Sequence, residues 1–202
     1  MRRLRGFTLV EALVTISIVA VLVAAVAPSA SQMLANMRLR GTSESLLSGL
    51  QKARSEAVKS NQTVTLWLVT TAAGRVDNSC RLSSTSRAWV VSYNDPSGKC
   101  GADPSTSVAP RIVQVSNGGT AGPDLSVAAY AADGATAATQ VSFDGFGRRP
   151  LATATSDISS IDISSSASGT RRLRAQISPA GNVRICDRDA PVTNPPDPRA
   201  CS

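Results

Sequence analysis

One apolar segment near the N-terminus constrains the fold more than any other feature of the chain. The 21 residues from Phe7 to Ala27 contain a single charged side chain, that of Glu11. As a helix that rises 1.5 Å per residue, they would extend about 31 Å, close to the hydrocarbon thickness of a bilayer. Three of the first five residues are arginines. The positive-inside rule therefore predicts a single-pass transmembrane helix that starts in the cytoplasm, with the rest of the chain exported.

Glu11 is the least expected residue of this segment. A carboxylate inside a bilayer costs roughly 2.5 kcal/mol or more unless it has a partner, so we expect a positive group beside it. The alternative is that Glu11 lies near the headgroups in the first helical turn, where the helix dipole favours an acid. An ordinary secretory signal has a shorter apolar core that ends in a small-residue cleavage site, so this segment differs from one.

The N-terminus resembles the class III signal of type IV pilins and type II secretion pseudopilins. The match is carried by Met1-Arg-Arg-Leu-Arg-Gly6 followed by Phe7-Thr-Leu-Val-Glu11. The resemblance implies cleavage after Gly6 by a prepilin peptidase and N-methylation of the new terminus at Phe7. It also implies that Glu11 pairs with the terminal amine of a neighbouring subunit, and that Pro28 occupies the position of the helix-bending proline of pilins.

The composition argues against catalysis. The chain has no histidine, the residue that most often transfers protons and binds transition metals near neutral pH. Paired carboxylates and nucleophile motifs are also missing from the sequence. We therefore expect no enzymatic activity, no cofactor and no metal site.

The four cysteines predict disulfides. Cys80, Cys100, Cys186 and Cys201 lie far apart and form no CxxC pair, which disfavours a metal site or a redox motif. Two structural disulfides in an oxidising compartment fit better. Turn signals near Cys80 and Cys100 favour the sequential pairing, Cys80 with Cys100 and Cys186 with Cys201. The two other connectivities stay open at this point.

The helical pattern continues past Pro28 to about Lys59. An apolar stripe at spacings of three, four and seven predicts a helix face that packs on a sheet: Leu39, Leu46, Leu50, Ala53 and Ala57. After it, short β-rich runs predict eight strands, at Val64–Val69, Ala88–Tyr93, Arg111–Val115, Val127–Ala131, Gln140–Asp144, Ser160–Ile163, Arg172–Ile177 and Asn182–Cys186. Alanine, serine and threonine dominate residues 120–139 and 151–170, which indicates exposed loops, turns or edge strands.

These patterns predict an α+β protein, and the resemblance to pilins implies a type IV pilin-like fold. We expect a cleaved leader at residues 1–6 and a transmembrane and assembly half of the helix at 7–28. An amphipathic half at 29–60 would pack on one antiparallel sheet within a β-rich domain at 61–202.

Arginines gather in the C-terminal third of the chain. The formal net charge is +7, and residues 148–188 alone hold seven arginines against three aspartates. Arginine suits forked hydrogen bonds to phosphate, so this segment predicts an anionic partner such as DNA. A set of solvated surface arginines is the alternative.

The same segment carries a second resemblance. Ile177-Ser-Pro-Ala-Gly-Asn-Val-Arg-Ile-Cys-Asp187 and Phe143-Asp-Gly-Phe-Gly-Arg-Arg149 are similar to signature elements of the GspH/FimT family. Some FimT-like members bind DNA through Gly-Arg-x-Arg, of which Gly181 and Arg184 match while Asn182 replaces the first arginine. The resemblance implies a DNA-binding role for Gly181 and Arg184. We infer from the basic segment itself that the other arginines complete this DNA-binding set and compensate for Asn182: Arg148, Arg149, Arg171, Arg172, Arg174 and Arg188.

Together these features predict a minor pilin or pseudopilin of the bacterial inner membrane with a periplasmic C-terminal domain. Its partners would be prepilin peptidase, the inner membrane, other pilins or pseudopilins and, during natural transformation, DNA. The basic, disulfide-bearing domain favours a type IV pilus. The alternative is minor pseudopilin H of the type II secretion system, without DNA binding.

Overall fold

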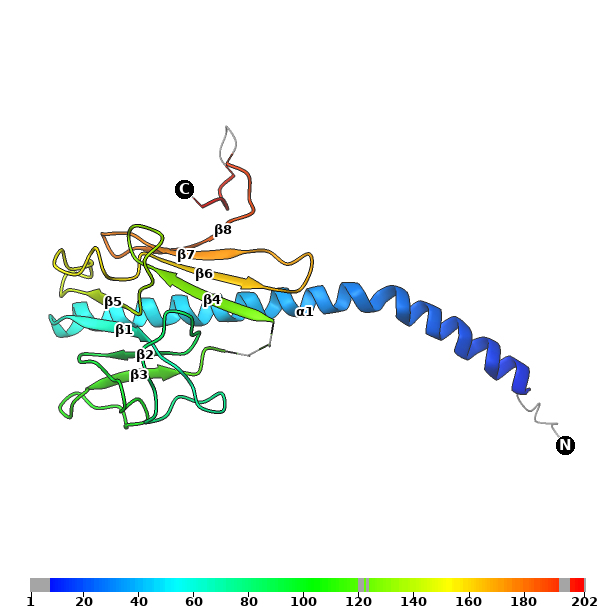
Figure 1. Cartoon of the computed structure of the whole chain (residues 1–202), viewed down its shortest axis with the longest axis horizontal. Coiled ribbons are helices and arrows are strands. Elements are labelled where there is room, and N and C mark those ends of the chain that lie inside the picture. The colour runs from blue at the N-terminus through cyan, green and yellow to red at the C-terminus, as the bar shows by residue number, and fades with distance from the viewer. Residues whose placement is uncertain (1–7, 120–121, 123, 193–196, 202) are drawn as a thin grey trace.

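The fold is built on one continuous helix, α1, which runs from Leu9 to Ser60 (Figure 1). The computed structural model describes residues 8–119, 122, 124–192 and 197–201, and only the backbone of residues 24–30. At the start of α1, the Thr8 hydroxyl accepts a hydrogen bond from the Glu11 N–H at 3.2 Å. At its end, Asn61 adopts a left-handed conformation and its N–H bonds to the Ala57 carbonyl. Both ends of the helix are thus capped locally.

The two halves of α1 have different surroundings. The half that starts at Leu9 extends away from the rest of the molecule and curves, whereas the half that ends at Ser60 lies among the strands (Figure 1). The backbone of Pro28 belongs to α1, and the helix continues through it without interruption. The predicted apolar stripe of the second half is buried, with each of its five side chains at most 1% exposed.

Eight strands follow α1, each within two residues of its predicted bounds. They are β1 (Val64–Leu68), β2 (Trp89–Ser92), β3 (Ile112–Ser116), β4 (Leu125–Tyr130), β5 (Gln140–Phe143), β6 (Ser160–Ser165), β7 (Leu173–Ile177) and β8 (Val183–Asp187). All pairings between these strands are antiparallel. The α+β class predicted from the sequence is confirmed.

The strands form two sheets rather than the one that we predicted. Their orders are β3-β2-β1-β5 and β4-β6-β7-β8, with four strands each. α1 contacts strands of both sheets, and one core cluster joins its buried stripe to side chains such as Leu66 and Phe143 of the first sheet and Ile161 and Ala175 of the second. Because one helix supplies the apolar surface for both, two short sheets can be covered without pairing to each other.

The second sheet also corrects a prediction about Ser- and Thr-rich segments. β4 is an edge strand, as expected, but β6 lies between β4 and β7. Ile161 and Ile163 of β6 are fully buried, whereas Asp162 between them points to the other face of the strand. Two isoleucines are enough to place this strand inside the sheet.

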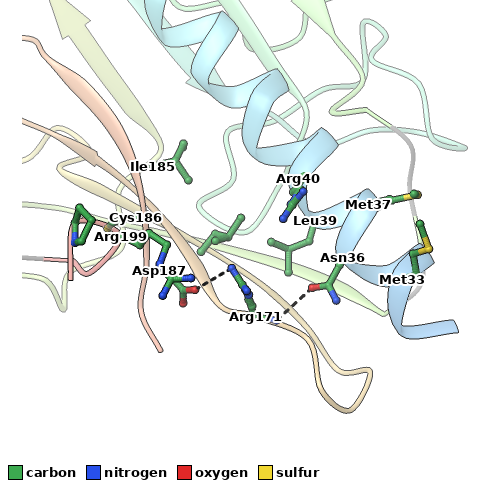
Figure 2. A pocket seen from close by; sticks show the side chains of 12 residues that line it. Met33, Asn36, Met37, Leu39, Arg40, Arg171, Ile185, Cys186, Asp187 and Arg199 are labelled. Atoms are coloured by element: carbon green, nitrogen blue, oxygen red, sulfur yellow. Dashed lines mark hydrogen bonds and ion pairs between the residues drawn. The ribbon is translucent and has the colours of Figure 1, made fainter. Parts of the chain in front are cut away.

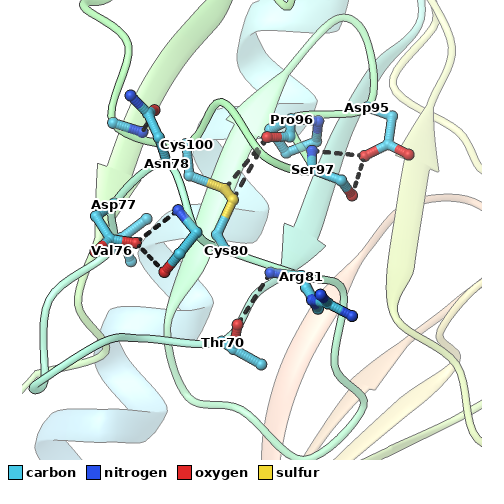
Figure 3. The surroundings of a disulfide bond; sticks show 12 residues. Thr70, Val76, Asp77, Asn78, Cys80, Arg81, Asp95, Pro96, Ser97 and Cys100 are labelled. Atoms are coloured by element: carbon cyan, nitrogen blue, oxygen red, sulfur yellow. Dashed lines mark hydrogen bonds between the residues drawn. A yellow bond between two sulfur atoms is a disulfide. The ribbon is translucent and has the colours of Figure 1, made fainter.

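Both faces of β1 are covered, which explains why all five of its residues are buried. Val64, Leu66 and Leu68 face α1, whereas Trp67 belongs to a second core cluster on the opposite face. That second cluster includes the disulfide between Cys80 and Cys100, whose Cα atoms lie 6.1 Å apart (Figure 3). The disulfide-bonded loops therefore act as a cover for the outer face of the first sheet.

The second disulfide joins Cys186 of β8 to Cys201, with 5.1 Å between their Cα atoms. Asp187 forms a bridge with Ala200, and its N–H donates to the Arg199 carbonyl at 2.7 Å. The C-terminal segment is thereby fixed along β8. The sequential pairing favoured by the sequence is confirmed for both disulfides.

Candidate functional site

The first candidate surface is the apolar half of α1, here the described side chains of residues 9–23. Ten large apolar side chains of this half are between 51% and 81% exposed. Among the described residues, the Glu11 carboxylate has no ion pair and no hydrogen-bond donor, since only its N–H is bonded, to Thr8. An exposed apolar surface of this size is typical of a site that contacts a membrane or another protein.

No helix among the described residues is long and apolar enough to cross a membrane.

Three of the predicted processing and assembly positions have no described side chain. Gly6 and Phe7 lie outside the described residues, and only the backbone of Pro28 is described. Their assigned roles stay predictions from the sequence.

The second candidate surface is the group of arginines on the sheet β4-β6-β7-β8, and aspartates pair with most of them. The Asp162 carboxylate accepts hydrogen bonds from Arg174 (2.9 Å) and Arg188 (2.6 Å). Arg172 is bonded to Asp189, which lies one residue beyond the segment considered in the sequence. These contacts raise the pKa of Arg174 and lower that of Asp189, because each favours the charged form.

Two further arginines of the predicted DNA-binding set also face carboxylates. Arg171 lies 3.7 Å from Asp187, and Arg148 lies 3.6 Å from Asp144. These arginines are more than half exposed, so the ion pairs are solvent-screened and their contribution to stability is small. Partial neutralisation weakens the positive field that the sequence suggested for this segment.

Arg149, in contrast, lies inside the domain and is only 6% exposed. Its guanidinium donates to the backbone carbonyls of Ala154, Asp157 and Ile177. Burial lowers the pKa of Arg149, and the charge of the nearby Asp157 opposes this effect. The side chain ties the loop after β5 to the end of β7 rather than facing solvent.

Gly181 has a structural role that follows from its backbone. Its φ is +79°, and a Cβ at this position would overlap the carbonyl oxygen of Gly147. Only glycine allows the turn before β8 to approach the turn after β5 this closely. The two signature elements recognised in the sequence are therefore in direct contact.

Arg54 of α1 is a residue of this region that the sequence did not single out. Its Nε donates to the Gly147 carbonyl at 2.9 Å and its guanidinium to Asn182 Oδ1 at 3.3 Å. A guanidinium group thus lies beside Asn182, where the DNA-binding pattern would have an arginine. Its place on the polar face of a helix gave no sign of this contact.

Arg184 and Arg174 line one shallow pocket of about 530 Å³, together with Gln176 and Asn182. Arg184 donates to Gln176 Oε1 at 3.0 Å and to the Ala200 carbonyl at 3.3 Å. The structure therefore brings Arg174, Arg184 and Gly181 to one region, with Arg148 on the adjoining turn. Among the described residues, no group of three or more His, Cys, Asp or Glu side chains could hold a metal ion.

A long helix with an exposed apolar half, whose other half packs on antiparallel sheets, defines the class of pilin-like subunits. The family model described as type II transport protein GspH matches residues 42–181, and that of the prokaryotic N-terminal methylation motif matches residues 1–27. The chain belongs to the GspH family and is a minor pilin or pseudopilin.

Comparison of structures gives two crystal forms of the type IV minor pilin FimU from Pseudomonas aeruginosa, each 19% identical in sequence. The first covers 73% of this chain and 87% of FimU, with a TM-score of 0.43. The second covers 72% and 90%, with a TM-score of 0.40. No curated protein matches the chain.

Proposed function

We propose that this chain is inserted in the bacterial inner membrane and joins other pilins in a periplasmic filament, a type IV pilus or a type II secretion pseudopilus. The observation that carries the proposal is the exposed apolar half of α1, with ten large apolar side chains at least 51% exposed. Such a surface is stable in a bilayer before assembly and against neighbouring helices afterwards. The domain that begins after it would be periplasmic, where the two disulfides can form.

Processing and assembly depend on different residues in this proposal. Prepilin peptidase cleaves after Gly6, and the new terminus at Phe7 is methylated. Glu11 then pairs with the terminal amine of a neighbouring subunit, which offsets the roughly 2.5 kcal/mol or more that an unpaired carboxylate costs in an apolar environment. The unpartnered state of Glu11 among the described residues supports this role.

Mass spectrometry of the membrane and filament fractions tests the proposal. A bulky Gly6→Val substitution should leave full-length precursor, because the peptidase needs access to the scissile backbone. Glu11→Ala should be processed normally but enter filaments poorly, whereas Glu44→Ala, an exposed acid on the amphipathic half, should change neither step. An intact Met1 terminus in wild-type cells with an active peptidase would contradict the proposal.

DNA binding is a second candidate function. It is supported by the location of Arg174 and Arg184 in one pocket and by the turn of Arg148, which contacts Gly181 beside that pocket. We rank it below the filament role, because Asp162, Asp189 and other carboxylates neutralise several of these arginines. The filament-only alternative, minor pseudopilin H, needs no such site.

Salt dependence separates the two candidates. Four arginines in contact with phosphates predict that log K falls against log salt with a slope of roughly −3 to −4. Arg184→Ala should weaken binding equally for unrelated duplexes and reduce the slope by about one, whereas Arg81→Ala, in the loop between β1 and β2, should have little effect. Equal weakening by both substitutions would indicate net charge alone. Absence of binding at low salt would leave the filament role without the DNA role.

A further inference from the structure

The uncharged part of α1 extends beyond the apolar segment at its start. No charged residue occurs between Glu11 and Arg38, and the 26 residues from 12 to 37 extend about 39 Å as a helix. That length is close to the roughly 40–45 Å of a bilayer with both headgroup layers. Near its end, Met33, Leu34 and Met37 are 60%, 54% and 54% exposed. In the proposed membrane-inserted state, these three side chains would lie at the headgroups of the periplasmic leaflet.

A pocket of about 520 Å³ opens at this end of the domain, between α1 and the strands β7 and β8 (Figure 2). Met33 and Met37 line it on the helix, and Leu173 and Ile185 line it on the sheet. Flexible methionine side chains suit the binding of an apolar group of irregular shape. The pocket thus offers an apolar surface where the inserted helix would leave the bilayer.

Fixed elements form the walls of this pocket. The Arg171 N–H donates to Asn36 Oδ1 at 3.4 Å, which ties the β6–β7 loop to α1. On the other side, the disulfide of Cys186 and the hydrogen bond from the Asp187 N–H to the Arg199 carbonyl hold the C-terminal segment along β8. A ligand would therefore meet a cavity that needs little rearrangement.

The charged side chains of the lining are mostly positive: they are Arg40, Arg171, Arg199 and Asp187. The Arg171 guanidinium lies 3.7 Å from Asp187, and that of Arg199 lies 2.7 Å from Asp197. Within the part of the chain that the structure describes, the exposed Arg40 side chain has no hydrogen bond and no ion pair. Its guanidinium is therefore available for forked hydrogen bonds to a phosphate group.

We propose that this pocket binds the headgroup of an anionic phospholipid of the periplasmic leaflet before the subunit enters a filament. The lipid phosphate bonds to Arg40, and the glycerol and the first acyl carbons contact Met33 and Met37. The order of these side chains along α1 fits such a ligand. The methionines are nearer to the membrane segment than Arg40, and side chains on a helix lean toward its N-terminus, here toward the membrane. The proposal rests on the membrane insertion proposed for this chain.

The combination of groups in the pocket favours a lipid over other occupants. A soluble anion such as inorganic phosphate would use the Arg40 guanidinium but leave the methionines exposed. An apolar protein segment would cover the methionines but leave the guanidinium without an anion. An anionic phospholipid satisfies both, and the membrane holds it beside the pocket at a high effective concentration. The contact would hold the domain against the membrane surface until assembly.

The methionines themselves provide the test. The sequence contains three, of which Met1 belongs to the predicted leader and the other two line the pocket. The full chain is reconstituted in phosphatidylcholine vesicles with increasing fractions of phosphatidylglycerol and treated with hydrogen peroxide, which transfers one oxygen atom to each thioether and leaves water. Peptide mass spectrometry gives the rate of sulfoxide formation at Met33 and Met37. We expect both rates to fall several-fold as the phosphatidylglycerol fraction rises.

Arg40→Gln removes the available guanidinium but keeps an exposed polar side chain, so the fold should be unchanged. The phosphatidylglycerol fraction that gives half-maximal protection should rise by about fivefold, the contribution of one arginine near an anionic membrane surface. Arg81→Gln is the matched control, because Arg81 is also exposed and its guanidinium also has no partner among the described residues. It lies in the loop between β1 and β2, so this variant should leave the half-maximal fraction unchanged.

Four results would overturn the proposal. Equal shifts by the two variants would indicate net charge alone. Protection in pure phosphatidylcholine that Arg40→Gln does not weaken would indicate an apolar occupant, and protection by added inorganic phosphate without phosphatidylglycerol would indicate a soluble anion. A constant oxidation rate in all vesicles, for a chain that resists alkaline extraction from them, would exclude the lipid site and leave the membrane insertion intact. A chain that alkaline carbonate extracts from every vesicle would refute the insertion itself.

Discussion

Replacing Gly181 by alanine tests the contact between the two turns that lie before β8 and after β5. Gly181 has a φ of +79°, and a Cβ there would overlap the Gly147 carbonyl oxygen. Gly134 is a matched control, because its φ is +71° but a Cβ added there would meet no atom within 4 Å. Both substitutions impose the left-handed conformation on alanine, whereas only Gly181→Ala also forces two backbone segments apart.

The expected effects follow from these two contributions. The conformational penalty is about 1–2 kcal/mol for either variant. Displacement of packed backbone adds about 1–3 kcal/mol at Gly181, so that Gly181→Ala should lose about 2–5 kcal/mol of unfolding free energy. With a urea m-value of about 2 kcal/mol/M, the midpoint should fall by about 1–2.5 M for Gly181→Ala and about 0.5–1 M for Gly134→Ala.

Urea unfolding of the two variants and the wild type, followed by circular dichroism, measures these differences. The m-value should stay constant, because the surface exposed on unfolding hardly changes. If the two variants lose the same stability, the close approach of the turns has no energetic weight and our interpretation of Gly181 is refuted.

Three further predictions concern buried charge, disulfides and pH. Arg149→Met should destabilise the domain by about 3 kcal/mol, since three backbone carbonyls, two of them buried, lose their donor. Arg148→Met should change the free energy of unfolding by less than about 1 kcal/mol, and thermal unfolding compares the two variants. The natively folded domain should show no reactive thiol, and reduction should remove up to about 3 kcal/mol for each disulfide, with loops spanning separations of 20 and 15 residues. Hydrogen bonds from Arg199 lower the pKa of Asp197 to about 2, so the stabilisation by this ion pair is complete above pH 3.8 and is lost as the pH falls through about 2. Carboxyl NMR titration should give that midpoint, and Arg199→Gln should raise it toward 3.8.

The elements of this fold could be predicted from local patterns. The apolar stripe from Leu39 to Ala57 has helical spacing, and each of its members is buried. The strands could be located because short runs rich in β-branched residues are separated by segments rich in turn residues. Both signals are local in the sequence, so they can be recognised without knowledge of tertiary contacts.

The division into two sheets could not be predicted in this way. β1 pairs with β5, so that Val64 faces Phe143, nearly eighty residues later in the chain. Nothing in either segment identifies its partner, because strand pairing depends on long-range packing against α1. The strand β6 was predicted, but its place between β4 and β7 was not. The serine-rich residues around Ile161 and Ile163 indicated an exposed edge strand, although both isoleucines are buried.

The arginines show the same limit for the candidate surface. Sequence counts treated Arg149 and Arg174 alike, but Arg149 is buried and donates to backbone carbonyls, whereas Arg174 is bonded to Asp162 on the neighbouring strand. Charge totals contain no information on which carboxylate faces which guanidinium. The contact of Arg54 with Asn182 joins positions 128 residues apart and left no local signal.

The packing of a single helix on two sheets has a mechanical consequence. In the proposed filament, tension would be transmitted into the subunit along α1, whose side chains from Leu39 to Ala57 lie in one core with both sheets. To slide out, the helix would have to shear its contacts with both sheets at once instead of peeling from one of them. Because the contacts with both sheets must break together, we expect the domain to resist a pull along α1 more strongly than if one sheet alone held the helix.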